Sequence, residues 1–245
     1  MSNNPVALVT GGAKRIGADI VRTLHAAGFD IALHYHSSDV DARALQMELS
    51  AKREHSVLLL QANLADITAL PGLIDKTIAR FGRLDALVNN ASSFYPTPLG
   101  EISTQQFEDL FATNARAPLF LAQAAAPHLK ASCGAIVNMV DIYADRPLAR
   151  YTPYCMAKAA LVSMTYALAR ELGPEVRVNG VAPGNIIWST NMEKAETPAV
   201  VIERTALKRQ GAPSDIAGAI LFLVQGSNYI TGQILRVDGG RWLYI

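Results

Sequence analysis

Short apolar runs alternate with amphipathic segments along all 245 residues, and this alternation restricts the possible folds more than any other feature. The apolar runs lack the polar alternation of half-exposed strands, as parallel strands covered on both faces do. They lie at residues 6–10, 31–35, 57–61, 86–89, 135–140, 176–181 and 233–237. Helical patterns occupy residues 15–27, 40–52, 70–81, 104–129, 153–172 and 214–224. This order predicts an α/β fold, a doubly wound parallel sheet of about seven strands with helices on both faces.

The chain is predicted to be a single domain over residues 1–245, because no linker, internal repeat or low-complexity tract interrupts the pattern. Gly28, Gly82 and Gly173 follow predicted helices, and we expect each to end its helix in the left-handed conformation. A polar, irregular segment at residues 184–205 precedes the last long helix. Its position after a late strand predicts a substrate lid, with a variable surface loop as the alternative.

Charge and cysteine content exclude several classes of protein. The formal net charge of +1, without a block of like charges, argues against binding to nucleic acid or to an anionic membrane. The longest apolar stretch, residues 216–224, is too short to cross a bilayer. Cys133 and Cys155 have no metal-ligand spacing, so no metal site is expected. With no evident signal peptide, these features predict a cytoplasmic protein.

The glycine-rich stretch TGGAKRIG, residues 10–17, lies between the first predicted strand and the first predicted helix. Gly11 would allow a tight turn there, and Gly17 would let the helix approach the strand. The free N–H groups at the helix N-terminus suit a pyrophosphate. The stretch therefore predicts a Rossmann-type dinucleotide site in preference to a purely structural turn.

The end of the second predicted strand indicates which dinucleotide would bind. NAD sites usually carry Asp or Glu there, whereas this chain has His36, Ser37 and Ser38 and no acid before Asp39. Hydroxyl groups, an imidazole and the nearby Lys14 would accept a 2′-phosphate, which favours NADPH.

Asparagines follow the next two strands. Asn63 and Leu64 come after the third strand and could contact the adenine, while Asn90 and Ala91 follow the fourth strand beside the expected cofactor path. Each pair could equally be an ordinary turn, because asparagine is common in turns.

Tyr154 and Lys158 have the i, i+4 spacing that places two side chains on one face of a helix. An ammonium near a phenol favours the phenolate, so we expect Lys158 to lower the pKa of Tyr154. Asp141 precedes Tyr154 by thirteen residues. Together the three residues predict a proton-coupled reduction.

In their order and spacing these motifs resemble the short-chain dehydrogenase/reductase family over the whole chain. The resemblance is carried by TGxxxxxG at 10–17, NNA at 89–91, Asn114, YxxxK at 154–158, VNGVAPG at 178–184, and TGQ and VDGG near the end. Within the family the chain is most similar to the pteridine reductases. The features responsible are Arg15, HYHSS at 34–38, NASSFYPTP at 90–98, and Asp141 in place of the usual serine.

The resemblance implies an NADPH-dependent reductase of dihydropterins, and of dihydrofolate, that acts as a homotetramer. It implies that Arg15 contacts both the pyrophosphate and the pterin, that Ser92 binds cofactor and substrate, and that Phe94 stacks the pterin against the nicotinamide. It further implies that Asn114 seats a relay water near Lys158. The implied cofactor residues are Gly11, Lys14, Arg15, Ile16, Gly17, His36, Ser37, Ser38, Asn63, Leu64, Asn90, Ala91, Ser92, Tyr154, Lys158 and Gly184.

Asp141 narrows the expected substrate. Reduction of a carbonyl develops negative charge on oxygen, and an ionised carboxyl beside it would repel that charge. A pterin ring nitrogen must instead gain a proton, which a protonated carboxyl can donate. We expect burial to raise the pKa of Asp141, and Asp141 and Tyr154 to titrate as a coupled pair that relays the proton.

Two other functions stay open. One is a carbonyl reductase acting on a ketone, a sugar or a 3-oxoacyl substrate, against which Asp141 and Phe94 argue. The other is a non-catalytic NADP-binding protein, against which the complete set of Asn114, Tyr154 and Lys158 argues. The apolar helices at 107–129 and 153–172 could pair across a two-fold axis or be covered within the monomer. Arg241, near the C-terminus, is expected to be a solvated charge, with a contact to a neighbouring subunit's pocket as the alternative.

Overall fold

The computed structural model describes residues 4–187 and 197–244, and these residues contain a seven-stranded sheet. Every strand pair is parallel, in the order β3-β2-β1-β4-β5-β6-β7, so the predicted doubly wound sheet is confirmed. The strand order reverses between β1 and β4, where such sheets bind ligands. The strands are β1 Val6–Val9, β2 Asp30–Tyr35, β3 Val57–Gln61, β4 Ala86–Asn89, β5 Ala135–Met139, β6 Arg177–Pro183 and β7 Ile234–Val237.

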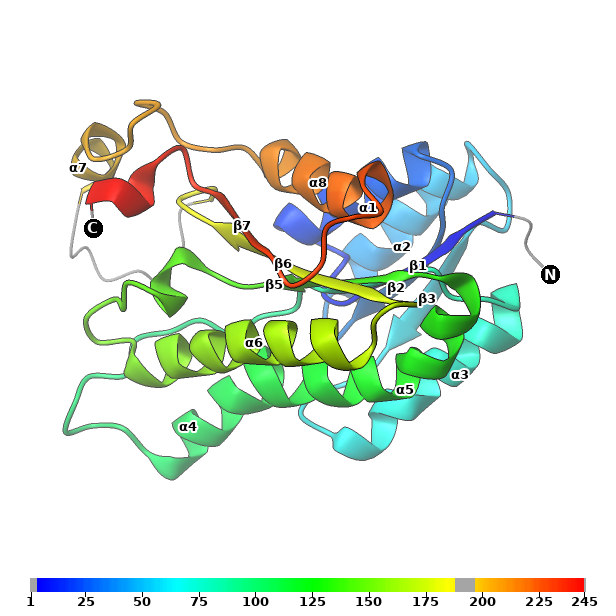
Figure 1. Ribbon diagram of the computed structural model, residues 1–245, viewed down its shortest axis with the longest axis horizontal. Helices are drawn as coiled ribbons and strands as arrows, with labels where there is room; N and C mark the ends of the chain where they lie inside the picture. The colour runs from blue at the N-terminus through cyan, green and yellow to red at the C-terminus, as the bar shows by residue number, and fades with distance from the viewer. Residues whose placement is uncertain (1–3, 188–196, 245) are drawn as a thin grey trace.

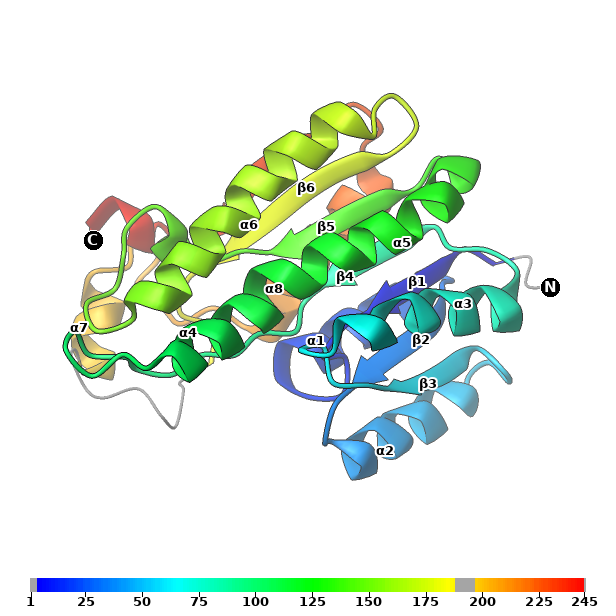
Figure 2. The same ribbon diagram turned by 90° about the horizontal axis from the view of Figure 1, so that it is seen from below.

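Helices cover both faces of the sheet, as Figures 1 and 2 show. One face carries α1 Arg15–Ala26, α2 Asp39–Ser50 and α8 Pro213–Leu221. The other carries α3 Leu70–Phe81, α5 Ala117–Ser132 and α6 Thr152–Glu171, with α4 Thr104–Phe111 against α6. The short α7, Pro198–Glu203, lies near the C-terminal turn (Figure 1). No helix in the two described stretches combines the length and hydrophobicity that a bilayer crossing requires.

The strand β1 shows why the apolar runs are continuous. Val6 and Leu8 point into the core formed with α3 and α5, whereas Ala7 and Val9 point into the core formed with α1 and α8. All four side chains are fully buried. Successive strand residues alternate between faces, so a strand with a helix layer on each side needs apolar residues at every position.

The helix predicted at residues 104–129 is interrupted. A π-helical turn, Ala112–Arg116, lies between α4 and α5, and a second one, Phe222–Gly226, follows α8. A π turn inserts an extra residue and rotates the following side chains, and such turns are frequent at functional sites. Asn114 lies within the first of them.

Two of the three predicted glycine helix ends are confirmed. Gly28 and Gly82 have φ values of 97° and 82°, in the left-handed region. The prediction for Gly173 is wrong, because α6 ends at Glu171 and Gly173 is not left-handed. Pro174 follows Gly173, and a proline favours an extended backbone in the residue before it.

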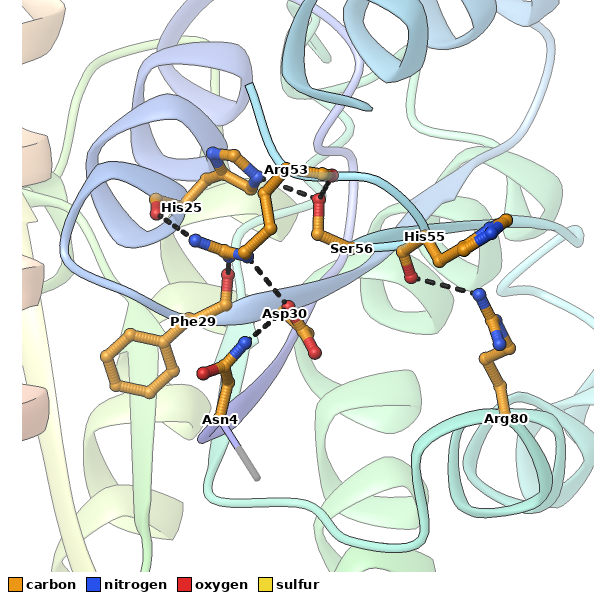
Figure 3. A network of polar contacts seen from close by, with 8 residues as sticks. All are labelled: Asn4, His25, Phe29, Asp30, Arg53, His55, Ser56 and Arg80. Atoms are coloured by element: carbon orange, nitrogen blue, oxygen red, sulfur yellow. Dashed lines mark hydrogen bonds and ion pairs between the residues drawn. The ribbon is translucent and has the colours of Figure 1, made fainter. Parts of the chain in front are cut away.

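A buried polar cluster, here called the amino-end cluster, joins α1, β2 and the start of β3 (Figure 3). Its members are His25, Asp30, Arg53 and Ser56. His25 Nε2 lies 2.8 Å from Ser56 Oγ, and Ser56 donates to the Arg53 carbonyl at 2.5 Å. Arg53 Nε donates to Asp30 at 3.1 Å, and its terminal nitrogens donate to the carbonyls of His25 and Phe29. Because Ser56 already donates its proton, His25 Nε2 carries the proton between the two side chains.

Candidate active site

A cavity of about 650 Å³ opens at the carboxyl ends of the strands, on both sides of the point where the strand order reverses. Loops that follow β1, β2, β4, β5 and β6 all contribute to its wall, as the topology of a doubly wound sheet requires. Of the predicted site residues, the cavity is lined by Gly11, Lys14, Arg15, Ile16, Gly17, His36, Ser37, Ser38, Asn90, Ala91, Ser92, Phe94, Asp141, Tyr154, Lys158 and Gly184.

Three predicted site residues do not line the cavity: Asn63, Leu64 and Asn114. Asn63 accepts a hydrogen bond from the Ala65 N–H in a local turn, so its adenine contact stays a prediction. The predicted lid is described only in part. Its first residues, 184–187, and Val201 of α7 line the cavity, while residues 188–196 lie outside the described part of the chain.

The glycine-rich turn is closely packed. Gly11 has a φ of 62°, and a Cβ atom on Gly17 would lie 2.1 Å from the Gly11 carbonyl oxygen. The Asn90 side chain donates to the carbonyls of Thr10 and Gly11 at 2.9 and 3.1 Å, which ties the turn to the end of β4. Arg15 also adopts a left-handed backbone, with a φ of 52°. This conformation costs a non-glycine residue about 1–2 kcal/mol.

His34 has no role in the sequence prediction, but it supports this turn from the end of β2. Its Nδ1 accepts the Gly11 N–H at 3.2 Å, so the proton sits on Nε2, which donates to the Ala62 carbonyl at 3.1 Å. Burial lowers the pKa of His34 to about 4, which keeps the ring neutral. The sequence signal for the Gly11–His34 hydrogen bond was His34 itself, a polar side chain within the otherwise apolar run that forms β2.

The residues expected to hold a 2′-phosphate lie at the start of α2. His36 and Ser37 are exposed there, beside two acidic residues that are already paired. Asp41 contacts Lys14 Nζ at 2.9 Å, and Asp39 contacts Arg43 Nε at 2.7 Å. The negative charge near this part of the cavity is therefore compensated by cations.

Asp141, Tyr154 and Lys158, here called the carboxyl-end cluster, meet beyond the end of β5. Tyr154 Oη donates to Asp141 Oδ2 at 2.6 Å, and the Tyr143 N–H donates to Asp141 Oδ1 at 2.9 Å. Lys158 Nζ donates to the Met139 carbonyl at 2.8 Å and lies 5.6 Å from the centre of the Tyr154 ring. The phenol, the carboxyl and the ammonium thus face one cavity wall.

Burial determines the protonation of this cluster. It raises the pKa of Asp141, as expected, while the Tyr143 N–H and Tyr154 hydroxyl oppose the shift. Burial, followed by the Asp141 charge, also raises the pKa of Tyr154 well above its usual value. The expectation that Lys158 lowers the pKa of Tyr154 is therefore wrong. Burial lowers the pKa of Lys158 itself to about 8, opposed by Asp141.

Asn114 holds the loop after β4 in place. It is 1% exposed, which excludes a solvent-facing role. Its Oδ1 accepts from Ser92 Oγ at 2.7 Å, and its Nδ2 donates to the Ser93 and Leu110 carbonyls, each at 2.9 Å. The π turn directs this carboxamide toward the loop, so Asn114 positions Ser92 from behind the cavity wall.

Aromatic rings surround Phe94, which lines the cavity. Phe94 stacks on Tyr151 with centroids 4.6 Å apart and meets Tyr154 edge-on at 4.7 Å. Tyr151, which was not predicted, does not itself line the cavity but packs against Phe94, which does. The rings fix Phe94 beside the Tyr154 phenol.

Arg241 is 4% exposed and lines the cavity, so the prediction of a solvated charge is wrong. A turn through Gly239 and Gly240, both left-handed, directs the chain back toward the sheet. The Asp238 carboxylate closes this turn by accepting the N–H groups of Gly240 and Trp242 at 3.0 and 2.7 Å.

Known proteins are similar in sequence to this chain over nearly its whole length. A family model described as enoyl-(acyl carrier protein) reductase matches residues 11–241. Pteridine reductase 1 of Leishmania tarentolae is 37% identical, with 96% of each chain covered. The 3-oxoacyl-(acyl-carrier-protein) reductase of Staphylococcus epidermidis is 33% identical over 98% of this chain and 100% of the relative. The corresponding enzyme of Staphylococcus aureus is 33% identical over 97% and 98%.

Proposed function

Because the chain belongs to the short-chain dehydrogenase/reductase family, a family of oxidoreductases, we propose that it reduces a dihydropteridine to the tetrahydro form with NADPH. Dihydrobiopterin-like, dihydromonapterin-like and dihydrofolate substrates all belong to this class. The observation that carries the proposal is the 2.6 Å hydrogen bond between Tyr154 and Asp141 in the cavity wall.

The residues around the cavity fit NADPH. The first turn of α1 contains no acidic residue, so its N–H groups are available to a pyrophosphate. A Cβ atom on Gly11 would lie 3.0 Å from Ala91 Cα, so glycine keeps the turn close to the β4 loop. His36, Ser37 and Ser38 would hold the 2′-phosphate, and Lys158 the nicotinamide ribose. When bound, NADPH supplies the hydride for the substrate carbon.

Asp141 and Tyr154 supply the proton in this proposal. The raised pKa of Asp141 makes its protonated form accessible, and a protonated carboxyl can donate to a ring nitrogen. The raised pKa of Tyr154 keeps its phenol protonated before the reaction. Once Asp141 has donated its proton, Tyr154 can transfer the phenol proton to Asp141 along their hydrogen bond. Lys158 stabilises the negative charge that remains on this pair. Phe94 gives the flat substrate ring an apolar wall.

A second candidate function is the reduction of a 3-oxoacyl thioester, which the identity of 33% to the Staphylococcus enzymes supports. Asp141 argues against it, because a carboxylate beside the reacting oxygen would oppose the alkoxide that forms there. The Tyr154–Asp141 bond therefore favours the pteridine reaction.

The test is NADPH oxidation by the purified protein and by Asp141→Ser, with a dihydropterin, dihydrofolate, a simple ketone and a 3-oxoacyl thioester as substrates. We expect the unmodified protein to prefer the pteridines, and Asp141→Ser to lose most of that activity while retaining NADPH binding. Full pteridine activity in Asp141→Ser, or ketone turnover with no pteridine turnover in the unmodified protein, would contradict the proposal.

We also propose that the protein acts as a cytoplasmic homotetramer. Three large side chains on the outer faces of α5 and α6, Leu119, Met156 and Tyr166, are 42%, 48% and 51% exposed. These helices have apolar surface that a second copy could cover. Sedimentation of the purified protein tests the assembly, and a monomer at micromolar concentration would contradict it.

A further inference from the structure

The C-terminal segment packs behind the loop that carries Asp141. Trp242 lies in a 3-10 turn, Arg241–Tyr244, and its indole packs against an apolar cluster that includes Val140 and Ile142. These two residues flank Asp141 in the sequence. Trp242 therefore packs against the same cluster in which both chain neighbours of Asp141 are buried.

Two guanidinium groups hold the indole ring. The Arg146 guanidinium carbon lies 4.5 Å from the ring centre, and that of Arg236 lies 4.2 Å from it. Arg236 also contacts Asp145 at 2.7 Å. Arg146 and Asp145 belong to the loop just after Asp141, whereas Arg236 belongs to β7. Cations over an aromatic face attract it electrostatically, so Trp242 connects this loop to the edge of the sheet.

The backbone at Trp242 is fixed as well. Its N–H donates to the Asp238 carboxylate at 2.7 Å, and the Gly239 carbonyl in the same turn accepts the Leu207 N–H at 3.0 Å. The turn is thereby tied to the segment that follows α7. Trp242 is thus held at its backbone and at its ring, a firm support for the loop against which it packs.

We propose that Trp242 is a positioning residue that keeps the Asp141 carboxyl in hydrogen-bonding reach of Tyr154. The inference rests on the proposed function, because the proton relay uses that hydrogen bond. Trp242 does not itself line the cavity, so it acts through the backbone of residues 140–146. Such an effect can be large, since a displacement of about 1 Å at a reacting group can reduce the rate about 100-fold.

The experiment compares Trp242→Ala, Trp242→Phe and the control Leu243→Ala, which alters an exposed neighbour in the same turn. We expect Trp242→Ala to lower kcat for the dihydropteridine at least about tenfold, with the Kd for NADPH changed less than about twofold. Trp242→Phe keeps an aromatic face for the two guanidinium groups and should restore most of kcat. Leu243→Ala should behave as the unmodified protein.

Deuterium uptake at residues 140–150 provides a readout that needs no substrate. We expect Trp242→Ala to exchange faster there than Leu243→Ala, with the glycine-rich turn unchanged. Unchanged kcat and uptake in Trp242→Ala, equal losses in Leu243→Ala, or failure of Trp242→Phe to restore kcat would each overturn the inference. If the unmodified protein reduces a 3-oxoacyl thioester and no pteridine, the proposed function fails, and the same criteria apply with that substrate. If the unmodified protein reduces neither a pteridine nor a 3-oxoacyl thioester, the deuterium uptake of Trp242→Ala alone decides whether Trp242 positions the Asp141 loop.

Discussion

Two buried polar clusters lie at opposite ends of the sheet, and they differ in whether their side chains line the cavity. The amino-end cluster contains a serine and a histidine 2.8 Å apart, yet none of its four side chains lines the cavity. Its donors instead reach backbone carbonyls and Asp30. The carboxyl-end cluster places all three side chains on the cavity wall. Close polar side chains therefore indicate chemistry only where a substrate can reach them; elsewhere they hold the fold together.

The largest contrast should come from Tyr154→Phe, which removes the hydroxyl of the proposed proton relay. We expect kcat for pteridine reduction to fall about 1,000-fold, within the range for loss of a general acid or base. The free energy of unfolding should change by less than about 1 kcal/mol, because the ring packing is retained. NADPH oxidation and urea denaturation measure the two effects. Residual activity above a tenth of the original would remove Tyr154 from the relay.

The second contrast is Arg53→Met in the amino-end cluster, which should reduce stability and leave activity unchanged. The change leaves the Asp30 carboxylate and the carbonyls of His25 and Phe29 without the Arg53 donors. We expect the free energy of unfolding to fall by about 2–3 kcal/mol, with kcat unchanged in the folded protein. The matched control is Arg43→Met, which breaks an exposed ion pair with Asp39 and should cost under about 1 kcal/mol. A large loss of kcat in Arg53→Met would break the comparison.

The third contrast concerns pH and activity. The pKa of Lys158 is lowered to about 8, so its ammonium is present below that pH and lost above it. We expect kcat/KM to fall as pH rises through about 8, approaching tenfold for each further pH unit. The free energy of unfolding should show no matching fall. A flat activity profile between pH 7 and 10 would argue against an essential Lys158 ammonium.

The smallest contrast concerns pH and stability in the amino-end cluster. Burial, reinforced by Arg53, lowers the pKa of His25 in the folded protein, so the unfolded chain binds the additional proton more readily. The stabilisation is therefore present above the unfolded pKa of about 6.5 and is lost as pH falls below it. We expect His25→Asn to reduce this acid sensitivity, without altering kcat. Melting curves from pH 7 to pH 5 measure the change, and parallel curves would contradict it.

The sheet could be predicted from sequence because burial on both faces leaves an apolar run in each strand. The π turn at Ala112–Arg116 could not, since one inserted residue hardly changes a helical pattern over so short a stretch. Strand ends, in contrast, place Gly11, Asn90 and Asp141 at one edge of the sheet once the topology is known. The gathering of most candidate residues around one cavity follows from that rule.

Protonation in the site could be predicted only in part. The spacing of Tyr154 and Lys158 gives their common helix face, and they do lie together. The spacing does not show how deeply Tyr154 is buried, nor that the charge acting most strongly on its pKa is that of Asp141. The burial of Arg241 was equally inaccessible, because it depends on a turn folding back onto a distant part of the chain.

Arg15 stands at a left-handed position where glycine would sit at lower energy, by about 1 kcal/mol. Its side chain nevertheless borders the cavity, where the proposed substrate would contact it. A laboratory screen for heat resistance would therefore tend to recover Arg15→Gly, and the survivors would melt later but bind their substrate less well. Selection for thermal stability alone would therefore reduce the binding of the proposed substrate.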